Sequence, residues 1–217
     1  MQLKFPVKIH HFLGVLDISN TVFVGPLDGS IFESMQKLIY LRLNNNEFNS
    51  TMPLEIAHLP ELKALYANKA GIQDNLDWLP YMPNIFEVWL DENPQLKGTI
   101  PIQISAMTNL ASLSISNCNI EGSIPSELAS LPRLTQVWLF GNSLTGKIPR
   151  DIGNMDSLRV FSIEDNDIVD TMPPEICSLR LDNGLVTLTA DCGGDDAEVS
   201  CETGCCTCCI SPCFEAH

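Results

Sequence analysis

Basic residues and histidine are scarce in this sequence. Its 217 residues include 12 Lys and Arg against 27 Asp and Glu, a formal net charge of −15, and only four histidines. Binding to nucleic acid relies on many Lys and Arg at phosphates, so we expect no nucleic-acid partner. The same charge argues against a surface attracted to anionic lipid, and it favours either a solubilising surface or one that attracts a basic partner.

Long apolar segments and catalytic motifs are also missing. No apolar stretch is long enough to span a bilayer, so we expect no transmembrane segment. The first residues, MQLKFPVK, lack the apolar run of a signal peptide. The sequence has no GxGxxG loop, no phosphate-binding GxxxxGK loop and no recognisable nucleophile motif beside a histidine. We therefore predict that the protein is not an enzyme and that it holds no cofactor or metal.

What the sequence does contain is a repeat. The tetrapeptides GSIP from Gly122 and GKIP from Gly146 stand 24 residues apart, and a fixed period of about 20 to 50 residues is typical of a solenoid. Aligned on the pattern LxxLxLxxN, seven units follow one another at intervals of 23 to 25 residues. They begin at Leu13, Leu38, Leu62, Ile85, Leu110, Leu134 and Leu158.

Each unit should form one turn of such a solenoid. The LxL alternation predicts a short strand with its leucines on one face. The Asn that follows can bond backbone groups that would otherwise be buried without partners. A closing stretch such as SELASLP has its apolar residues at helical spacing. One unit cannot bury its own leucines, so the units must stack into a continuous core.

The pattern LxxLxLxxN followed by GxIP resembles the leucine-rich repeat family in its plant-specific subtype, which forms the ectodomains of plant receptor-like kinases and the polygalacturonase-inhibiting proteins. The resemblance covers about residues 13–179. It implies an α/β repeat solenoid, a curved stack with a parallel β-sheet on the concave side and short helical or 3-10 segments on the convex side. It also implies binding of peptides, proteins or co-receptors through exposed strand positions.

The repeats divide the chain into three expected parts. Residues 1–12 would be an N-terminal covering segment or a truncated cap, 13–180 the seven repeats, and 181–217 a Cys-rich C-terminal cap. Residues 1–12 either supply one covering strand or follow upstream repeats that this chain lacks; the sequence leaves both open. A solenoid needs caps because its end units would otherwise expose their apolar cross-section.

Three units depart from the pattern at the Asn position. Thr21 stands there in the first unit and Cys118 in the fifth. The unit from Leu62 has Ala70 at this position and no GxIP. We expect fewer of its backbone groups to have their usual partner, and faster amide exchange over residues 70–77 than in the turns around Asn142 and Asn166.

Eight of the nine cysteines gather at the end of the chain. An even set favours four disulfides, which can compensate for the small core of a cap, although the connectivity stays open. A metal–thiolate cluster is the alternative, but no histidine lies among these residues. The tail also resembles the Cys-rich ends of leucine-rich repeat proteins from diatoms and related algae. The candidates are Cys177, Cys192, Cys201, Cys205, Cys206, Cys208, Cys209 and Cys213.

The cysteines also suggest a location. Disulfides persist in oxidising compartments, so we expect the protein outside the cell, at the cell surface or in such a lumen. The sequon Asn49-Ser50-Thr51 fits this expectation and makes Asn49 a glycosylation candidate.

The third, fifth, seventh and eighth positions of LxxLxLxxN should be exposed on the concave face, and aromatic residues gather at the first three of these positions. Large exposed aromatics are favoured as binding anchors, although they could also merely cover the sheet. Trp89 and Trp138 share the fifth position two units apart, so their rings would lie about 10 Å apart with a gap over Ser114 that a side chain or sugar could enter. The candidate ligand-binding residues are Tyr40, Arg42, Tyr66, Glu87, Trp89, Asp91, Gln136, Trp138 and Phe140.

We therefore predict a non-catalytic recognition module that binds a protein or peptide through its concave face. The carboxylates near Trp89 would suit a basic or hydroxyl-rich group. One alternative is a structural or assembly subunit of a larger complex, which would have a large, permanent apolar interface. The other is a cell-wall binder of a glycan or a hydrolase, by analogy with the polygalacturonase-inhibiting proteins.

Overall fold

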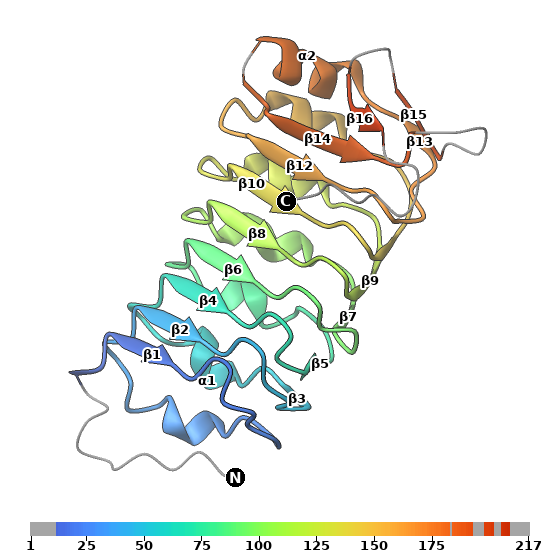
Figure 1. The fold of residues 1–217 in the computed structure, drawn as a ribbon. Helices are drawn as coiled ribbons and strands as arrows, with labels where there is room; N and C mark the ends of the chain where they lie inside the picture. Colours follow the sequence, from blue (N-terminus) through green and yellow to red (C-terminus); the bar gives the residue numbers. More distant parts are fainter. Residues whose placement is uncertain (1–11, 183, 193–197, 202–204, 209–217) are drawn as a thin grey trace.

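A stack of similar turns, with one row of parallel strands along one side, forms the molecule (Figure 1). The computed structural model describes residues 12–182, 184–192, 198–201 and 205–208. The row is a nine-stranded parallel sheet in which each strand pairs with the next turn's strand. The predicted α/β solenoid is confirmed. The strands are β1 (Val15–Asp17), β2 (Tyr40–Arg42), β4 (Ala64–Tyr66), β6 (Glu87–Trp89), β8 (Ser112–Ser114), β10 (Gln136–Trp138), β12 (Val160–Ser162), β14 (Thr187–Ala190) and β16 (Thr207–Cys208).

The register of this sheet puts equivalent residues of successive turns side by side. Leu41 pairs with Leu65, Leu65 with Val88, and Val88 with Leu113. These central residues are buried in the core. Because side chains alternate across a strand, the residues before and after them form two rows on the opposite, concave face. The register of the sheet alone therefore sets the relative positions of the predicted ligand-binding residues on this face.

Short helices and small sheets close the turns. The helices are α1 (Leu54–Ala57), α2 (Pro174–Asp182) and the 3-10 helices η2 (Gly29–Ile31), η3 (Leu79–Tyr81), η4 (Ile102–Ala106), η5 (Ser126–Ser130) and η6 (Arg150–Asn154). In each of η4, η5 and η6 the Pro of the Ile-Pro pair directly precedes the helix as its N-cap. The small parallel sheets are β7 (Lys97–Gly98) with β9 (Asn119–Gly122) and β11 (Ser143–Leu144), β3 (Ser50–Thr51) with β5 (Ile72–Gln73), and β13 (Asp170–Thr171) with β15 (Val199–Ser200).

Asparagine side chains tie each turn to the preceding one. Asn46 donates through Nδ2 to the carbonyl of its own turn at Leu43, 2.8 Å, and to that of the preceding turn at Ile18, 2.9 Å. Its Oδ1 accepts from the backbone N–H of Phe23 at 3.0 Å. Asn93, Asn142 and Asn166 repeat this arrangement. Buried backbone groups of two turns are thus satisfied by one side chain.

The turn with Ala70 keeps its usual backbone partners, contrary to the expectation from sequence. The N–H groups of Ala70 and Ile72 both donate to Oδ1 of Asn93, at 3.1 and 2.9 Å. Asn93 also donates to the carbonyl of Ala67 at 2.8 Å. These two N–H groups are thus served by the Asn of the following turn. The groups that an Asn at position 70 would serve lie in the preceding turn, where the N–H groups of Asn46 and Phe48 donate instead to the carbonyls of Lys69 and Ala70, at 3.1 and 3.0 Å. The physical basis for faster exchange is therefore absent there.

Thr21 and Cys118 take up part of the asparagine's role in their own turns. The Thr21 hydroxyl donates to the Ile18 carbonyl at 2.5 Å. The Cys118 sulfur lies 3.4 Å from the Leu90 carbonyl oxygen. Burial raises the pKa of the Cys118 thiol to about 12. Cys118 is a free thiol, and it is partly buried.

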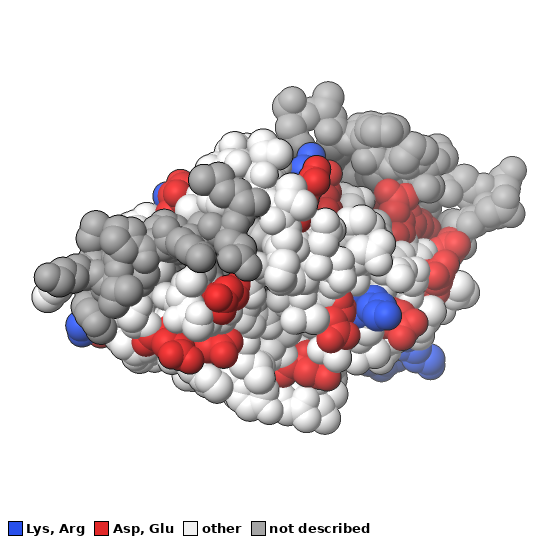
Figure 2. Space-filling view, turned by 90° about the horizontal axis from the view of Figure 1, so that it is seen from below, with Lys and Arg blue, Asp and Glu red and all other residues white. Residues whose placement is uncertain are grey.

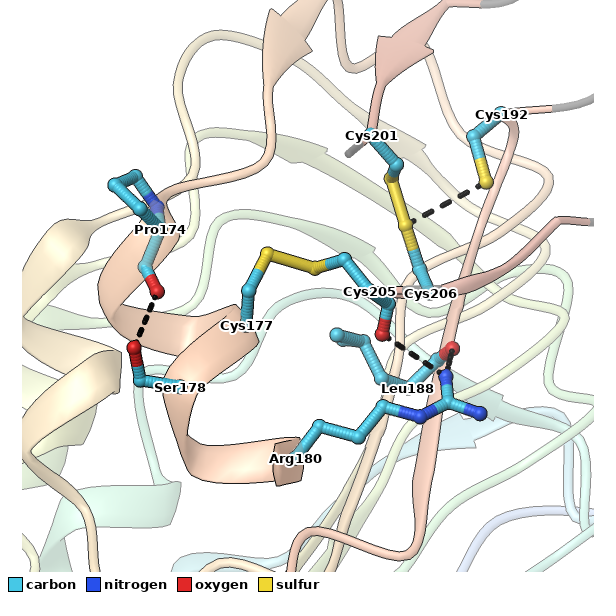
Figure 3. The surroundings of a disulfide bond; sticks show 9 residues. All are labelled: Pro174, Cys177, Ser178, Arg180, Leu188, Cys192, Cys201, Cys205 and Cys206. Atoms are coloured by element: carbon cyan, nitrogen blue, oxygen red, sulfur yellow. Dashed lines mark hydrogen bonds between the residues drawn. A yellow bond between two sulfur atoms is a disulfide. The ribbon is translucent and has the colours of Figure 1, made fainter. Parts of the chain in front are cut away.

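The C-terminal end continues the sheet and is held by disulfides (Figure 3). Strands β14 and β16 extend the sheet into the segment expected to be the cap. A disulfide joins Cys177 of α2 to Cys205, and a second joins Cys201 to Cys206. Cys192 is also disulfide-bonded, and its sulfur lies 3.5 Å from that of Cys206.

The predicted set of four disulfides stays a prediction for the remaining cysteines. Cys209, Cys213 and the side chain of Cys208 lie outside the described residues. Arg180 adds a second link at this end, because its guanidinium donates to the Cys205 carbonyl at 3.0 Å and to the Leu188 carbonyl at 3.5 Å. Helix α2 is therefore bound to the final strands both covalently and through hydrogen bonds.

Candidate functional site

Three aromatic side chains form a continuous row on the concave face. Tyr66 of β4 and Trp89 of β6 meet edge to face, with ring centroids 5.3 Å apart and an interplanar angle of 84°. Trp89 and Trp138 of β10 meet in the same way, with centroids 6.4 Å apart and an angle of 75°. Edge-to-face contacts at such distances are favourable. All three rings remain partly exposed, so the row is a pre-arranged surface and not part of the core.

The predicted gap between the two tryptophans is wrong. Their rings lie 6.4 Å apart and contact each other across β8, where the sequence suggested about 10 Å from the strand spacing alone. Ser112 and Ser114 of β8 are small enough to be covered by the indoles and are buried, not exposed. Trp89 Nε1 donates to the Ser112 hydroxyl at 3.0 Å. The indole of Trp89 is therefore tilted over β8 and fills the space left by the serines.

Polar contacts extend the row toward the N-terminal turns. The Arg42 guanidinium stacks over the Tyr66 ring, 5.7 Å from its centroid, and pairs with the Asp17 carboxylate at 3.6 Å. The Tyr66 hydroxyl donates to the Glu87 carboxylate. Burial, with this hydrogen bond as the next cause, raises the pKa of Tyr66 to about 12. Contacts between side chains thus run from Asp17 to Trp89 and hold the face in one arrangement.

Carboxylates form a second row beside the aromatic one. Asp91 accepts from the Ser114 hydroxyl at 2.6 Å and from the Ser116 N–H at 2.7 Å. Glu164 accepts from the buried Thr189 hydroxyl. Burial is the main cause that raises the pKa of both carboxyl groups. Both carboxyl groups therefore lie in a partly desolvated position, held by hydrogen bonds from neighbouring turns.

Asp191 belongs to the same row, one strand further on. It accepts from the N–H groups of Asp165 and Asn166, at 2.9 and 3.3 Å. Burial raises its pKa as well. The Asp91 position of one turn corresponds to Glu164 and Asp191 in later turns, because the register pairs Trp89 with Ser114, Trp138 with Ser162, and Ser162 with Thr189.

The other predicted residues lie at the edges of this surface. Tyr40 of β2 is 40% exposed, and Gln136 and Phe140 are partly exposed. Among the described side-chain contacts none joins these three to the aromatic row. Asn49 is exposed in the turn before β3, where its Nδ2 donates to the Glu47 carbonyl at 3.2 Å. Ligand binding by this face and glycosylation at Asn49 both stay predictions.

Comparison with known proteins supports a leucine-rich repeat architecture. A profile described as Leucine Rich Repeat matches residues 109–131 and 133–155. The leucine-rich repeat ectodomain of the Arabidopsis thaliana receptor kinase GASSHO1/SCHENGEN3 superposes with a TM-score of 0.70 and 28% identity, over 76% of this chain. Residues 109–155 thus contain leucine-rich repeats, and the chain as a whole has the leucine-rich repeat fold. Its repeats superpose on the Arabidopsis receptor kinase HAESA with a TM-score of 0.68 and 28% identity, over 73% of this chain.

Other matches of this leucine-rich repeat protein are more distant or shorter. A leucine-rich repeat protein of Leptospira interrogans has the same fold, with a TM-score of 0.73 and 23% identity over 91% of this chain. An uncharacterized Caenorhabditis elegans protein is 38% identical over 69 residues. The chain spans 14% of that protein, and 20% and 26% of the two Arabidopsis chains. No helix in the described ranges is both long enough and apolar enough to cross a bilayer.

Sequence reasoning missed several residues of this leucine-rich repeat surface. Asp17 and Glu164 occupied the correct strand positions but were not among the predicted ligand-binding residues. Thr189 and Asp191 lay in the segment assigned to the cap. Their signal was LVTLTAD from Leu185, a further copy of the strand pattern displaced by the length of α2.

Proposed function

We propose that the protein is a non-catalytic recognition module that binds a peptide or protein segment through its concave face. The aromatic row of Tyr66, Trp89 and Trp138 carries this proposal, because its rings are fixed by mutual contacts and yet partly exposed. Trp and Tyr dominate binding energy at protein interfaces. A surface held in place before binding loses little conformational entropy when a partner arrives.

The similar ectodomains support a peptide or protein partner. One was solved in complex with CASPARIAN STRIP INTEGRITY FACTOR 2, and HAESA was solved with the peptide hormone IDA and a co-receptor. We infer a relation to the plant-specific subtype from these neighbours and from the GxIP turns. The disulfide between Cys177 and Cys205 supports an extracellular, cell-surface or lumenal location, since disulfides persist in oxidising compartments.

A glycan is the weaker candidate for this face. A sugar gripped between two indoles needs the rings to stand apart, whereas Trp89 and Trp138 contact each other edge to face. The Tyr66 hydroxyl at the end of the row is already bonded to the Glu87 carboxylate. Assembly into a larger complex is tested by the same experiment, because an assembly surface would not select short peptides.

The test is selection from a phage-displayed library of random 12-residue peptides on the full chain. Selected peptides are then measured by calorimetry against the wild type and against Trp89→Ala and Trp138→Ala. We expect each substitution to weaken binding by about 2 kcal/mol or more, roughly 30-fold, with little change in melting temperature. Tyr81→Ala is the matched control, because Tyr81 is 61% exposed on η3, away from the strands.

Two outcomes would overturn the proposal. Peptides that bind both tryptophan variants as well as the wild type would show that the aromatic row is not the site. A library that yields no enriched peptide, together with a stable oligomer in light scattering, would favour the assembly subunit.

A further inference from the structure

The charges of the concave face are strongly one-sided. At the third, fifth and seventh positions of its strands, from β1 to β14, Arg42 is the one basic residue. The acidic residues at these positions are Asp17, Glu87, Asp91, Glu164 and Asp191. The whole sequence shares this bias, with 12 Lys and Arg against 27 Asp and Glu, and the view in Figure 2 shows acidic side chains in several places with few basic ones between them.

Arg42 does not neutralise the acidic residues near the tryptophans. It pairs with Asp17 at 3.6 Å, and two lysines are paired elsewhere, Lys37 with Glu61 and Lys69 with Glu92. In the part of the chain that the structure describes, Glu87, Asp91, Glu164 and Asp191 therefore have no basic partner. The tail cannot provide a Lys or Arg either, because none follows Arg180 in the sequence.

Neutral groups hold these carboxylates in place. The donors are the hydroxyls of Tyr66, Ser114 and Thr189 and backbone N–H groups. Hydrogen bonds from neutral donors orient a carboxylate and leave its charge uncompensated. The raised pKa values of Asp91, Glu164 and Asp191 have the same cause, since burial removes water without supplying a cation.

The carboxylates fall into two groups beside the aromatic row. Glu87, Trp89 and Asp91 are alternate residues of one chain segment and therefore project to the same side, about 7 Å from one to the next. A cation over the Trp89 ring would meet the aromatic face and a carboxylate on either side. Glu164 and Asp191 form the second group, three and four strands beyond Asp91, or about 14 and 19 Å.

These distances match an extended peptide. A chain lying across the strands advances about 3.3 Å per residue, so the two groups are about four to six residues apart. Side chains of an extended chain alternate between two faces, and therefore only an even separation places both on the carboxylates. A divalent metal ion is a less suitable ligand for this face. It would bind the carboxylates alone and make no contact with the indoles that lie between the two groups.

We propose that the concave face binds an extended basic peptide, with one Lys or Arg at Glu87, Trp89 and Asp91 and a second, four or six residues away, at Glu164 and Asp191 beside Trp138. The inference rests on the proposed function and names the chemistry of its ligand. The partner is thus a basic segment of a protein or a basic peptide, to which this acidic face is complementary in charge.

The experiment uses the phage-displayed 12-residue library described above. We expect the enriched peptides to contain pairs of Lys or Arg at separations of four or six, and to lack a preference for five. The test variant is Glu87→Gln with Asp91→Asn, which removes two charges and keeps acceptors for Tyr66, Ser114 and Ser116. The control, Glu121→Gln with Asp151→Asn, makes the same charge change at exposed residues of β9 and η6.

Fluorescence anisotropy at low and high salt then measures one enriched, fluorescein-labelled peptide on all variants. The concave double variant should bind at least tenfold more weakly at low salt, the control less than twofold, and the difference should shrink as salt rises. Replacing the basic residues of the peptide by citrulline or norleucine should lower binding to the wild type and have little further effect on the concave double variant.

The outcomes separate this inference from the proposed function. Peptides that depend on Trp89 and Trp138 but are not enriched in basic residues would overturn the inference and leave the proposed function intact. An equal loss in the concave and control variants would also overturn it, because net charge alone would then explain binding. Peptides that depend on neither tryptophan would overturn both.

Discussion

Replacing Asn93 by Ala tests how the leucine-rich repeats hold one another. Asn93 is fully buried. It accepts from the N–H groups of Ala70 and Ile72 and donates to the carbonyls of Ala67 and Leu90, with all four distances between 2.7 and 3.1 Å. The Ala side chain can make none of these hydrogen bonds.

The expected cost follows from the number of buried donors that lose their partner. A buried N–H without a partner costs about 1 to 3 kcal/mol, so the two donors of Ala70 and Ile72 give about 4 kcal/mol. Asn142→Ala is the matched comparison, because Asn142 accepts from one such donor, Ile120, at 3.0 Å. Its cost should be about 2 kcal/mol.

Urea unfolding of both variants measures the difference, and amide exchange locates it. Solenoids can unfold in parts, so the site-resolved measurement is the decisive one. In the wild type, the amides of Ala70 and Ile72 should exchange as slowly as those of Ile120 and Leu144, and Asn93→Ala should accelerate the first pair selectively. Rapid exchange of Ala70 and Ile72 in the wild type, or no response to Asn93→Ala, would refute the reasoning.

Three further predictions concern cysteine and acid chemistry. Cys118, with its pKa raised to about 12 by burial, should resist iodoacetamide at pH 8 in the folded protein and react once urea unfolds it, as mass spectrometry will show; rapid native labelling would contradict this. Replacing Cys177 and Cys205 together by Ser should lower the unfolding free energy by about 3 to 4 kcal/mol, since their disulfide closes a loop between residues 28 positions apart. Urea unfolding measures this loss, with a substitution at the free Cys118 as the control. Burial raises the pKa of Asp91 above its ordinary 3.8, so the folded state holds this proton to higher pH than the unfolded state, and wild-type stability falls as pH rises through that range. Asp91→Asn removes this titration, and its stability relative to the wild type should therefore increase between pH 3 and pH 7; a constant difference over that range would contradict the raised pKa.

The repeat period was sufficient to predict the strands of the seven repeats and the face of the sheet on which each of their residues lies. Leu41, Leu65 and Val88 are buried at the centres of their strands, as the LxL alternation requires. Tyr66, Trp89 and Trp138 lie on the opposite face in one row, because the register is the same in every turn. A periodic pattern predicts the strands and their buried faces because equivalent residues pack in the same way in every turn.

Side-chain directions could not be predicted in the same way. Strand spacing placed Trp89 and Trp138 about 10 Å apart, whereas the rings tilt toward each other over two small serines and contact at 6.4 Å. The partner of Ala70 was missed for a similar reason, since it comes from Asn93 in the next turn. Both depend on contacts between turns, and a pattern that describes one turn at a time does not contain them.

The asparagine links run in one direction along the chain. Asn46 completes the backbone of the turn before it, and Asn93, Asn142 and Asn166 do the same for theirs. During synthesis, a turn that precedes one of these asparagines therefore gains these hydrogen bonds only after the next turn has emerged. At the last of these turns Asp191 takes this part, accepting from Asp165 and Asn166. In a growing chain, these backbone hydrogen bonds would thus form in order from the N-terminal turns onward. The N–H groups of Asp165 and Asn166 would gain their partner only when the segment with Asp191 has left the ribosome.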